Sequence, residues 1–375
     1  MAYWPFKFYD VKIQEVIAVL ENWAPKSYQE SYDNSGLIVG DAQSEVSKCL
    51  VSLDCIEAVV DEAIENGVEL IVSHHPIVFS GLKSLTGETY VERVIIKAIQ
   101  NNIAIYAIHT NLDNVNTGVN FKIAEMLLLK DLKVLSPKAG LLKKLVTFVP
   151  VENLEEVKSA LFMAGAGHIG NYSESSFQVK GEGNFKPSAN ANPYLGELGR
   201  RNIAIENRLE VVLTSDKVSC VLSALRESHP YEDIAYDLYP LDNAIQTIGT
   251  GMIGELETPL SEDDFLAHVK TGLKADCIRH TALTGRKVKK VAFCGGSGSF
   301  LLGRAIGQKA DAFITGDFKY HEFFDADGKL MILDVGHFES EQFTIDLIAE
   351  KIQENFPIFA VLKTGKDTNP ISYYK

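Results

Sequence analysis

The feature that most constrains the fold is an apolar segment that ends in two adjacent histidines. Residues 68–72 predict a buried strand, His74 and His75 follow it, and Pro76 disfavours further strand pairing. Ligands of α/β sheets bind in the crevice beyond the carboxyl ends of the strands, which is where this pair falls. Because neighbouring side chains of a strand point to opposite faces, the histidines either share one metal at a backbone turn or bind two different metals. Buried histidines that are hydrogen-bonded to the backbone are the alternative.

Composition excludes some classes of function. The net charge of −14 argues against a nucleic-acid binder, since phosphate neutralisation needs a basic face. The five cysteines are scattered and lack CxxC spacing, which predicts reduced thiols rather than a disulfide framework. The sequence shows no signal peptide and no apolar run long enough to span a membrane, so we expect a cytoplasmic protein without a membrane partner.

The first third of the chain predicts parallel strands connected by helices. Residues 48–72 have the strand–helix–strand order of a βαβ unit, which requires a right-handed crossover. After a helix at 90–100, a strand at 103–108 runs into the segment His109-Thr110-Asn111-Leu112-Asp113. Asp113 is a hard anionic ligand that can bridge two cations, and a turn or a helix N-cap is its alternative role.

The pattern changes after about Ser136. The predicted order of elements becomes β-α-β followed by β-α-β, which is the ferredoxin-like arrangement. Turn residues are frequent near its end, and the earlier α/β pattern resumes beyond them. We therefore predict an α/β protein with a discontinuous core, residues 1–136 and 252–375, and an inserted α+β domain, residues 137–251.

The last third contains two further strand ends with polar residues. A strand at 289–294 runs into the segment Gly295-Gly296-Ser297-Gly298-Ser299, which is either a tight turn or an anion site at a helix N-terminus. A strand at 312–314 ends at Thr315-Gly316-Asp317, and His321 lies in the next helical turn.

A final strand, residues 329–335, ends just before His337. His337 and Glu341 lie four residues apart at the entrance of a helix, so they share one face of it. Histidine and carboxylate at this spacing are a recurrent pair of metal ligands, and a glutamate that only matches the helix dipole is the alternative.

The sequence thus predicts one cluster of metal ligands beyond the strand ends of a single α/β sheet. Three imidazoles and two carboxylates suit two divalent ions bridged by a carboxylate, with zinc as the first choice and manganese or iron as alternatives. No cysteine falls among them, which disfavours a structural zinc site with thiolate ligands. The predicted ligands are His74, His75, Asp113, His337 and Glu341.

The chain resembles the Nif-three-like dinuclear metal centre hexameric proteins, named in bacteria as GTP cyclohydrolase I type 2 homologues. The resemblance covers nearly the whole chain and is carried by Asp33-Asn34-Ser35-Gly36-Leu37, Ser73-His74-His75-Pro76, His109-Thr110-Asn111-Leu112-Asp113, Gly295-Gly296-Ser297-Gly298, Thr315-Gly316-Asp317 with His321, and Gly336-His337 with Glu341.

The resemblance implies a toroidal homohexamer, a trimer of dimers, with two metal ions per subunit facing an internal cavity. The five predicted ligands match the metal ligands of that family. His109 and His321 match further polar positions near the metals, and we expect them to transfer protons. The insertion, residues 137–251, is similar to the small PII/CutA-like domains.

Two classes of function remain open at this stage. The first is a metal-dependent hydrolase that acts on a small phosphorylated or heterocyclic compound through a metal-bridged hydroxide. The second is a non-catalytic ring that handles metal, docks a partner, or is regulated by a ligand of the insertion.

Overall fold

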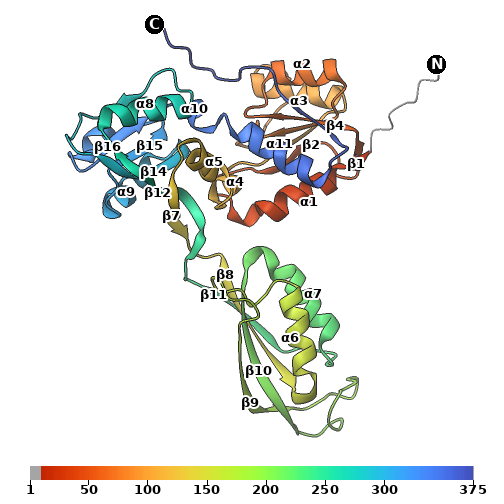
Figure 1. The fold of residues 1–375 in the computed structure, drawn as a ribbon. Helices are drawn as coiled ribbons and strands as arrows, with labels where there is room; N and C mark the ends of the chain where they lie inside the picture. Colours follow the sequence, from red (N-terminus) through yellow and green to blue (C-terminus); the bar gives the residue numbers. More distant parts are fainter. Residues whose placement is uncertain (1–9, 375) are drawn as a thin grey trace, which may run out of the picture. The chain divides into compact units, whose positions relative to one another are not determined.

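The computed structural model describes residues 10–374, which form two compact units (Figure 1). The first unit contains the chain up to Pro137 and from Gln246 onward, and the second runs from Lys138 to Ile245. The structure therefore places residues 246–251, which the sequence analysis assigned to the insertion, in the first unit. They lie in a long strand, β12 (Ile245–Leu260), and do not form a linker.

The glycines of β12 explain why this strand was missed. Gly251 has a φ of +65°, and a Cβ atom there would lie 3.0 Å from the carbonyl oxygen of Phe293 on the neighbouring strand. A glycine in a strand often marks such a close approach of two backbones, whereas in the sequence it resembles a turn.

The first unit contains a five-stranded sheet in the order β17-β4-β5-β6-β2. All neighbouring strands are parallel except β2, which is antiparallel to β6. Helices α2 and α3 connect β4 to β5 and β5 to β6, which confirms the predicted parallel βαβ arrangement. The bounds are β2 Gly36–Val39, β4 Lys48–Ser52, α2 Glu57–Asn66, β5 Leu70–Ser73, α3 Tyr90–Gln100, β6 Ala104–Ala107 and β17 Ala360–Lys363.

Two helical layers cover this sheet (Figure 1). On one side, Val59 and Ala63 of α2 and Val94 of α3 pack with Ile71 and Ile105 of the central strands in one apolar cluster. On the other side lie α1 (Ile13–Trp23) and α11 (Thr344–Asn355). Because both faces are buried, β5 and β6 consist mainly of apolar residues, and the predicted ligands lie past their ends.

A second, six-stranded sheet of the same unit has the order β13-β16-β15-β14-β12-β7. Its central strands β14, β15 and β16 are parallel, β12 is antiparallel to β14, and β13 is antiparallel to β16. The other bounds are β7 Lys130–Lys138, α8 Glu262–Gly272, β13 Arg279–His280, β14 Val288–Ser297, α9 Leu302–Gly307, β15 Ala312–Gly316 and β16 Met331–Asp334.

The expectation that all predicted ligands follow strands of one sheet is therefore wrong. Periodicity identifies strands, but it does not tell which strands pair when their partners are distant in the sequence. The two sheets nevertheless direct the carboxyl ends of their parallel strands to a common region. Short helices continue the chain there: α4 (Thr110–Asn114), α5 (Val119–Met126) and α10 (His337–Glu341).

The second unit has the order β8-α6-β9-β10-α7-β11 and an antiparallel sheet with the strand order β11-β8-β10-β9. This is the predicted ferredoxin-like α+β arrangement. Val157 and Leu161 of α6 and Val221 of α7 pack with Leu145 and Leu209 of the sheet. The bounds are β8 Leu142–Pro150, α6 Leu154–Met163, β9 Ser176–Phe185, β10 Asn202–Thr214, α7 Val218–Ser228 and β11 Tyr236–Leu241.

Within residues 10–374, no helix combines the length and the apolar character that a membrane crossing requires.

Replacement of Gly118 should destabilise the first unit. A Cβ atom at Gly118 would lie 1.8 Å from the carbonyl oxygen of Leu112, so Gly118→Ala must displace the backbone beside Asp113. We expect a loss of about 1–3 kcal/mol in the free energy of unfolding, as for other overpacked sites. Urea unfolding followed by tryptophan fluorescence measures it, since the indole of Trp23 donates to the hydroxyl of Thr117. Gly303→Ala, with no heavy atom within 4 Å of its added Cβ, is the matched control and should not lower stability.

Candidate metal centre

His74 follows β5 and is fully buried. Its Nδ1 lies 2.8 Å from the carbonyl oxygen of Ile108, which can only accept a hydrogen bond, so Nδ1 carries the proton and Nε2 has a free lone pair. That Nε2 lies 3.6 Å from Oδ1 of Asp113 and 3.9 Å from Oε1 of Glu341. Both His74 Nε2 and Asp113 Oδ1 are buried without a hydrogen-bond partner. Two unpaired buried ligand atoms are costly, and a cation between them satisfies both.

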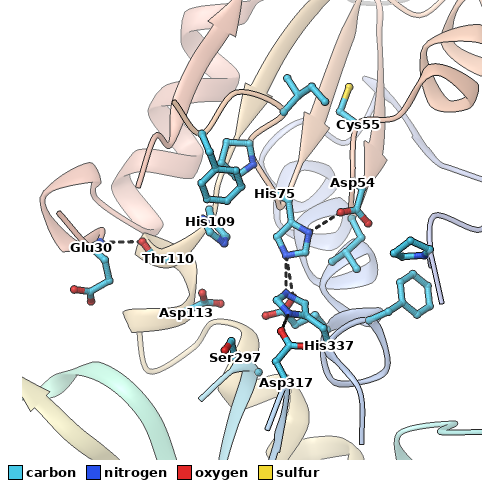
Figure 2. Close-up of a pocket in the computed structure, with 18 of the residues that line it drawn as sticks. Glu30, Asp54, Cys55, His75, His109, Thr110, Asp113, Ser297, Asp317 and His337 are labelled. Atoms are coloured by element: carbon cyan, nitrogen blue, oxygen red, sulfur yellow. Dashed lines mark hydrogen bonds and ion pairs between the residues drawn. The ribbon is translucent and has the colours of Figure 1, made fainter. Parts of the chain in front are cut away.

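His75 and His337 face the same carboxylate from the two different sheets. Nε2 of His75 lies 3.0 Å from Oε2 of Glu341, and Nε2 of His337 lies 3.1 Å from the same oxygen. The two Nε2 atoms are 3.3 Å apart. Three potential ligand atoms therefore meet at one point in the wall of a cavity, where Figure 2 labels His75 and His337.

The other nitrogen of each of these two imidazoles donates a hydrogen bond to a carboxylate. Nδ1 of His75 donates to Oδ1 of Asp54 at 2.8 Å, and Nδ1 of His337 donates to Oδ2 of Asp317 at 2.7 Å, as Figure 2 shows. Such pairs fix the tautomer and orientation of metal-binding histidines. The hydroxyl of Thr368, in the C-terminal segment, donates in turn to the second oxygen of Asp54 at 2.7 Å.

The structure brings all five predicted ligands together in two overlapping groups. The ligand atoms of His75, His337 and Glu341 lie within 4.8 Å of one another, and so do those of His74, Asp113 and Glu341. Glu341 belongs to both groups and turns one oxygen to each. This buried cluster of histidines and carboxylates can hold a metal ion.

His109 also belongs to the cluster. Its ring centroid lies 5.3 Å from those of His74 and His75, and the three histidines can bring ligand atoms within 4.8 Å of one another. Its Nδ1 donates to Oδ1 of Asp33 at 2.8 Å, so Nε2 is free. Burial would raise the pKa of Asp33, but the hydrogen bonds from His109 and Thr110 outweigh it and hold the carboxylate ionised.

His321 does not join the cluster. It is exposed on the 3₁₀ helix η5 (Tyr320–Ala326), and its ring contacts those of Tyr320 and Phe324. The position of His321 within this chain gives no support to the predicted role in proton transfer. The family resemblance suggested that role, but the turn of η5 directs the side chain to the surface.

Sequence reasoning missed the orienting carboxylates Asp33, Asp54 and Asp317. Asp54 and Asp317 each follow a buried strand directly, as the predicted ligands do, and that placement was a usable signal. Asp33 follows no strand, and its segment entered only through the family resemblance. Its hydrogen bond to His109 joins residues that are 76 positions apart, which local patterns do not reveal.

The glycine-rich segment at the end of β14 is structural. The backbone N–H groups of Gly295, Gly296 and Gly298 donate to side-chain oxygens of Asn120, Ser340 and Thr315, so they are not available to an anion. Gly296 has a φ of +61°, and a Cβ atom there would lie 2.5 Å from Oε1 of Glu341. The tight turn thus lets the backbone approach the cluster closely.

The charges of the metal-free cluster are balanced by protons. Burial, followed by the charge of Glu341, raises the pKa of Asp113 to about 7. Burial would also raise the pKa of Glu341, but His337 holds it well below its usual range. Glu341 in turn raises the pKa of His337 to about 11, and hydrogen bonds to Asp54 and Glu341 overcome burial to raise that of His75 to about 9. A cation can replace these protons.

The cluster lies at the wall of a cavity of about 520 Å³, which is a size that accommodates a small molecule. Apolar side chains form much of the lining, among them Phe79, Tyr90 and Phe300. The C-terminal segment contributes Asn369, Pro370 and Ile371.

Fold and cluster together define an α/β protein with a buried histidine–carboxylate cluster that can hold a metal ion. The family model described as Duf34/NIF3 (NGG1p interacting factor 3) matches residues 11–370, and the chain belongs to this family.

Similar proteins agree with this assignment. The chain is 42% identical over 327 residues to a Halalkalibacterium halodurans protein named GTP cyclohydrolase 1 type 2 homolog, covering 86% of this chain and 88% of that one. It is 38% identical over 366 residues to a Bacillus subtilis protein of the same name, covering 96% and 98%. Among solved structures, a Bacillus cereus protein related to NIF3 superposes with a TM-score of 0.83 at 37% identity, covering 98% of this chain and 100% of that one.

The Asp54 carboxylate should matter for metal affinity although it is not a predicted ligand. Asp54→Asn keeps an oxygen near His75 but removes the charge, and loss of such a partner typically costs about 10- to 100-fold in affinity. Competition of zinc between the protein and a chelator measures the effect. Asp61→Asn, at an exposed carboxylate of α2 paired with Lys97, is the matched control. Equal zinc affinity of the two variants would contradict a role of Asp54 in holding His75.

Metal binding should release protons at neutral pH. His75 and His337 are protonated there in the metal-free chain, since their pKa values are about 9 and about 11, and a ligand nitrogen must be deprotonated. Affinity for a divalent ion should therefore fall by about tenfold per pH unit below pH 11, where His337 is protonated, and by about a hundredfold per unit below pH 9, where His75 is protonated as well. Calorimetry in two buffers with different ionisation enthalpies counts the protons. Binding enthalpies that do not depend on the buffer would contradict the expectation.

Proposed function

We propose that this protein is a dinuclear metal-dependent hydrolase that acts on a small phosphorylated or heterocyclic compound. The observation that carries the proposal is the position of Glu341, which is shared by two groups of potential ligands at the wall of one cavity. His75, His337 and Glu341 would hold one ion, and His74, Asp113 and Glu341 the other. Zinc suits this set of imidazole and carboxylate ligands, with manganese or iron as alternatives.

Paired divalent ions activate water and stabilise both oxygens of a hydrolytic displacement. The side chains of this protein would orient the metal ligands and transfer the proton. Asp54 and Asp317 hold two imidazoles in the tautomer that offers Nε2 to a metal. His109, oriented by Asp33, offers its own Nε2 beside the cluster and can move a proton to or from the substrate. The aromatic lining offers apolar surface to the body of a substrate.

The names of the relatives support hydrolysis of a heterocyclic ring as one form of this activity. The cavity volume of about 520 Å³ fits a substrate of nucleotide size. The five free cysteines fit work in a reducing compartment such as the cytoplasm.

We also propose that the chain assembles into a homohexamer, a trimer of dimers. The sheet of the second unit leaves Phe177 and Val179 exposed on one face and Ile203 and Ile205 exposed on the other, and the first unit exposes Phe300. The burial of such large apolar side chains between subunits would favour an assembly.

A second candidate function is metal handling without catalysis. The His337 side chain is 35% exposed, so one of the two proposed positions can be reached from the solvent and can exchange its ion. Saturable turnover of a defined small substrate favours the enzyme, whereas stoichiometric transfer of metal to an apo-acceptor favours the carrier.

Loss of His75 should abolish turnover. A panel of phosphoesters and nucleotides is screened with the zinc-, manganese- and iron-loaded protein, and the best substrate is then used for the variants. His75→Ala should lower kcat by at least about a hundredfold, more than the loss of a partner outside the ligand set, while far-UV circular dichroism stays unchanged. His168→Ala, at an exposed histidine of the second unit, should leave turnover intact. Unchanged turnover in His75→Ala would rule out hydrolysis at this cluster.

A further inference from the structure

The second unit contains a cavity of its own, of about 440 Å³. It is formed by the ends of β8, β9 and β10, the loop between β9 and β10, and the segment that follows α7 (Figure 1). None of the residues that line it belongs to the metal cluster. The volume is that of a site for a small molecule, so the chemistry of its walls indicates what it binds.

A buried carboxylate forms part of the wall. Glu206 of β10 is only 9% exposed, and its Oε1 accepts a hydrogen bond of 2.7 Å from the hydroxyl of Tyr231. Among the described residues, Tyr231 is its one hydrogen-bonding partner, and no lysine or arginine forms an ion pair with it. A carboxylate that is largely shielded from bulk water is stabilised by a positive charge placed beside it.

Gly183 on the neighbouring strand makes room for this carboxylate. A Cβ atom at Gly183 would lie 2.2 Å from Oε2 of Glu206, and both residues line the cavity. The oxygen that Tyr231 does not use therefore lies at the cavity wall and can accept a hydrogen bond from a ligand.

The remaining walls suit a cation with an apolar body. Four aromatic side chains line the cavity, and the ring centroids of Tyr194 and Tyr231 are 6.1 Å apart and inclined by 48°. Aromatic faces attract ammonium groups electrostatically, and they pack well with apolar groups. Glu232 and Asp233 add negative charge to the lining, and Lys186 is its one basic residue. The four rings belong to Phe148, Phe185, Tyr194 and Tyr231.

We propose that this cavity is a binding site for a small organic ammonium ion with an apolar or aromatic body. Its ammonium group donates to Oε2 of Glu206, and its body packs against Tyr194 and Tyr231. The site is separate in residues from the metal centre, and its occupation does not depend on the hydrolase activity proposed above.

Three probes of equal shape and different charge test the site on the full-length protein. Phenethylamine is cationic at neutral pH, 2-phenylethanol is neutral and phenylacetate is anionic. Calorimetric titration should show the tightest binding for phenethylamine, with at least about tenfold weaker binding of the other two. Only the ammonium group forms a hydrogen bond to the carboxylate that is strengthened by opposite charges. Equal affinities, stronger binding of phenylacetate, or no binding of phenethylamine would overturn the proposal.

Variants then locate the binding. Glu206→Gln keeps the shape and should lower the affinity for phenethylamine at least about tenfold. Gly183→Ala should do the same, because its methyl group would displace the carboxylate. Tyr194→Ala should also weaken binding, since it removes a ring from the cavity wall, and the side chain is 47% exposed. Glu182→Gln, at an exposed carboxylate of β9 outside the cavity, is the matched control. Unchanged affinity in folded Glu206→Gln, or in both Gly183→Ala and Tyr194→Ala, would overturn the assignment.

Discussion

The structure depends on the Glu341 carboxylate, which is buried at the junction of two sheets and must be neutralised there. A buried carboxylate is tolerated only if opposite charges and hydrogen bonds compensate for the lost solvation. His75 reaches it from the end of β5, and His337 reaches it from α10, beyond the end of β16. The residues that compensate for this charge are therefore also the residues that connect the two sheets of the core.

Rigid surroundings hold these groups in place. Asp54 and Asp317 orient the imidazoles that face Glu341, and the carbonyl oxygen of Ile108 orients His74. The backbone at Gly296 lies so close to the carboxylate of Glu341 that no side chain fits between them. A site whose side chains are already oriented needs little rearrangement to exchange protons for a metal ion. A hydrolytic metal centre and a metal carrier share this property.

The two cavities described above differ in their chemistry. In the first unit, several imidazoles and carboxylates converge at the cavity wall, which suits a divalent metal. In the second unit, a single buried carboxylate is surrounded by aromatic rings, which suits a larger and softer cation. The ligand site proposed for the insertion gives this protein a means to respond to a second compound, in addition to the chemistry of its core.

The sequence by itself determined the parallel βαβ order of the core, the ferredoxin-like order of the insertion and the residues of the metal cluster. These follow from local signals: apolar periodicity marks the strands, and His74, His75 and His337 stand directly beyond strand ends. The division into two sheets, the extension of β12 through residues 246–251, the pairing of Asp33 with His109 and the exclusion of His321 were decided by the tertiary structure alone. Each depends on which distant segments pack together, and that choice is made by the burial of whole surfaces, which no local pattern contains.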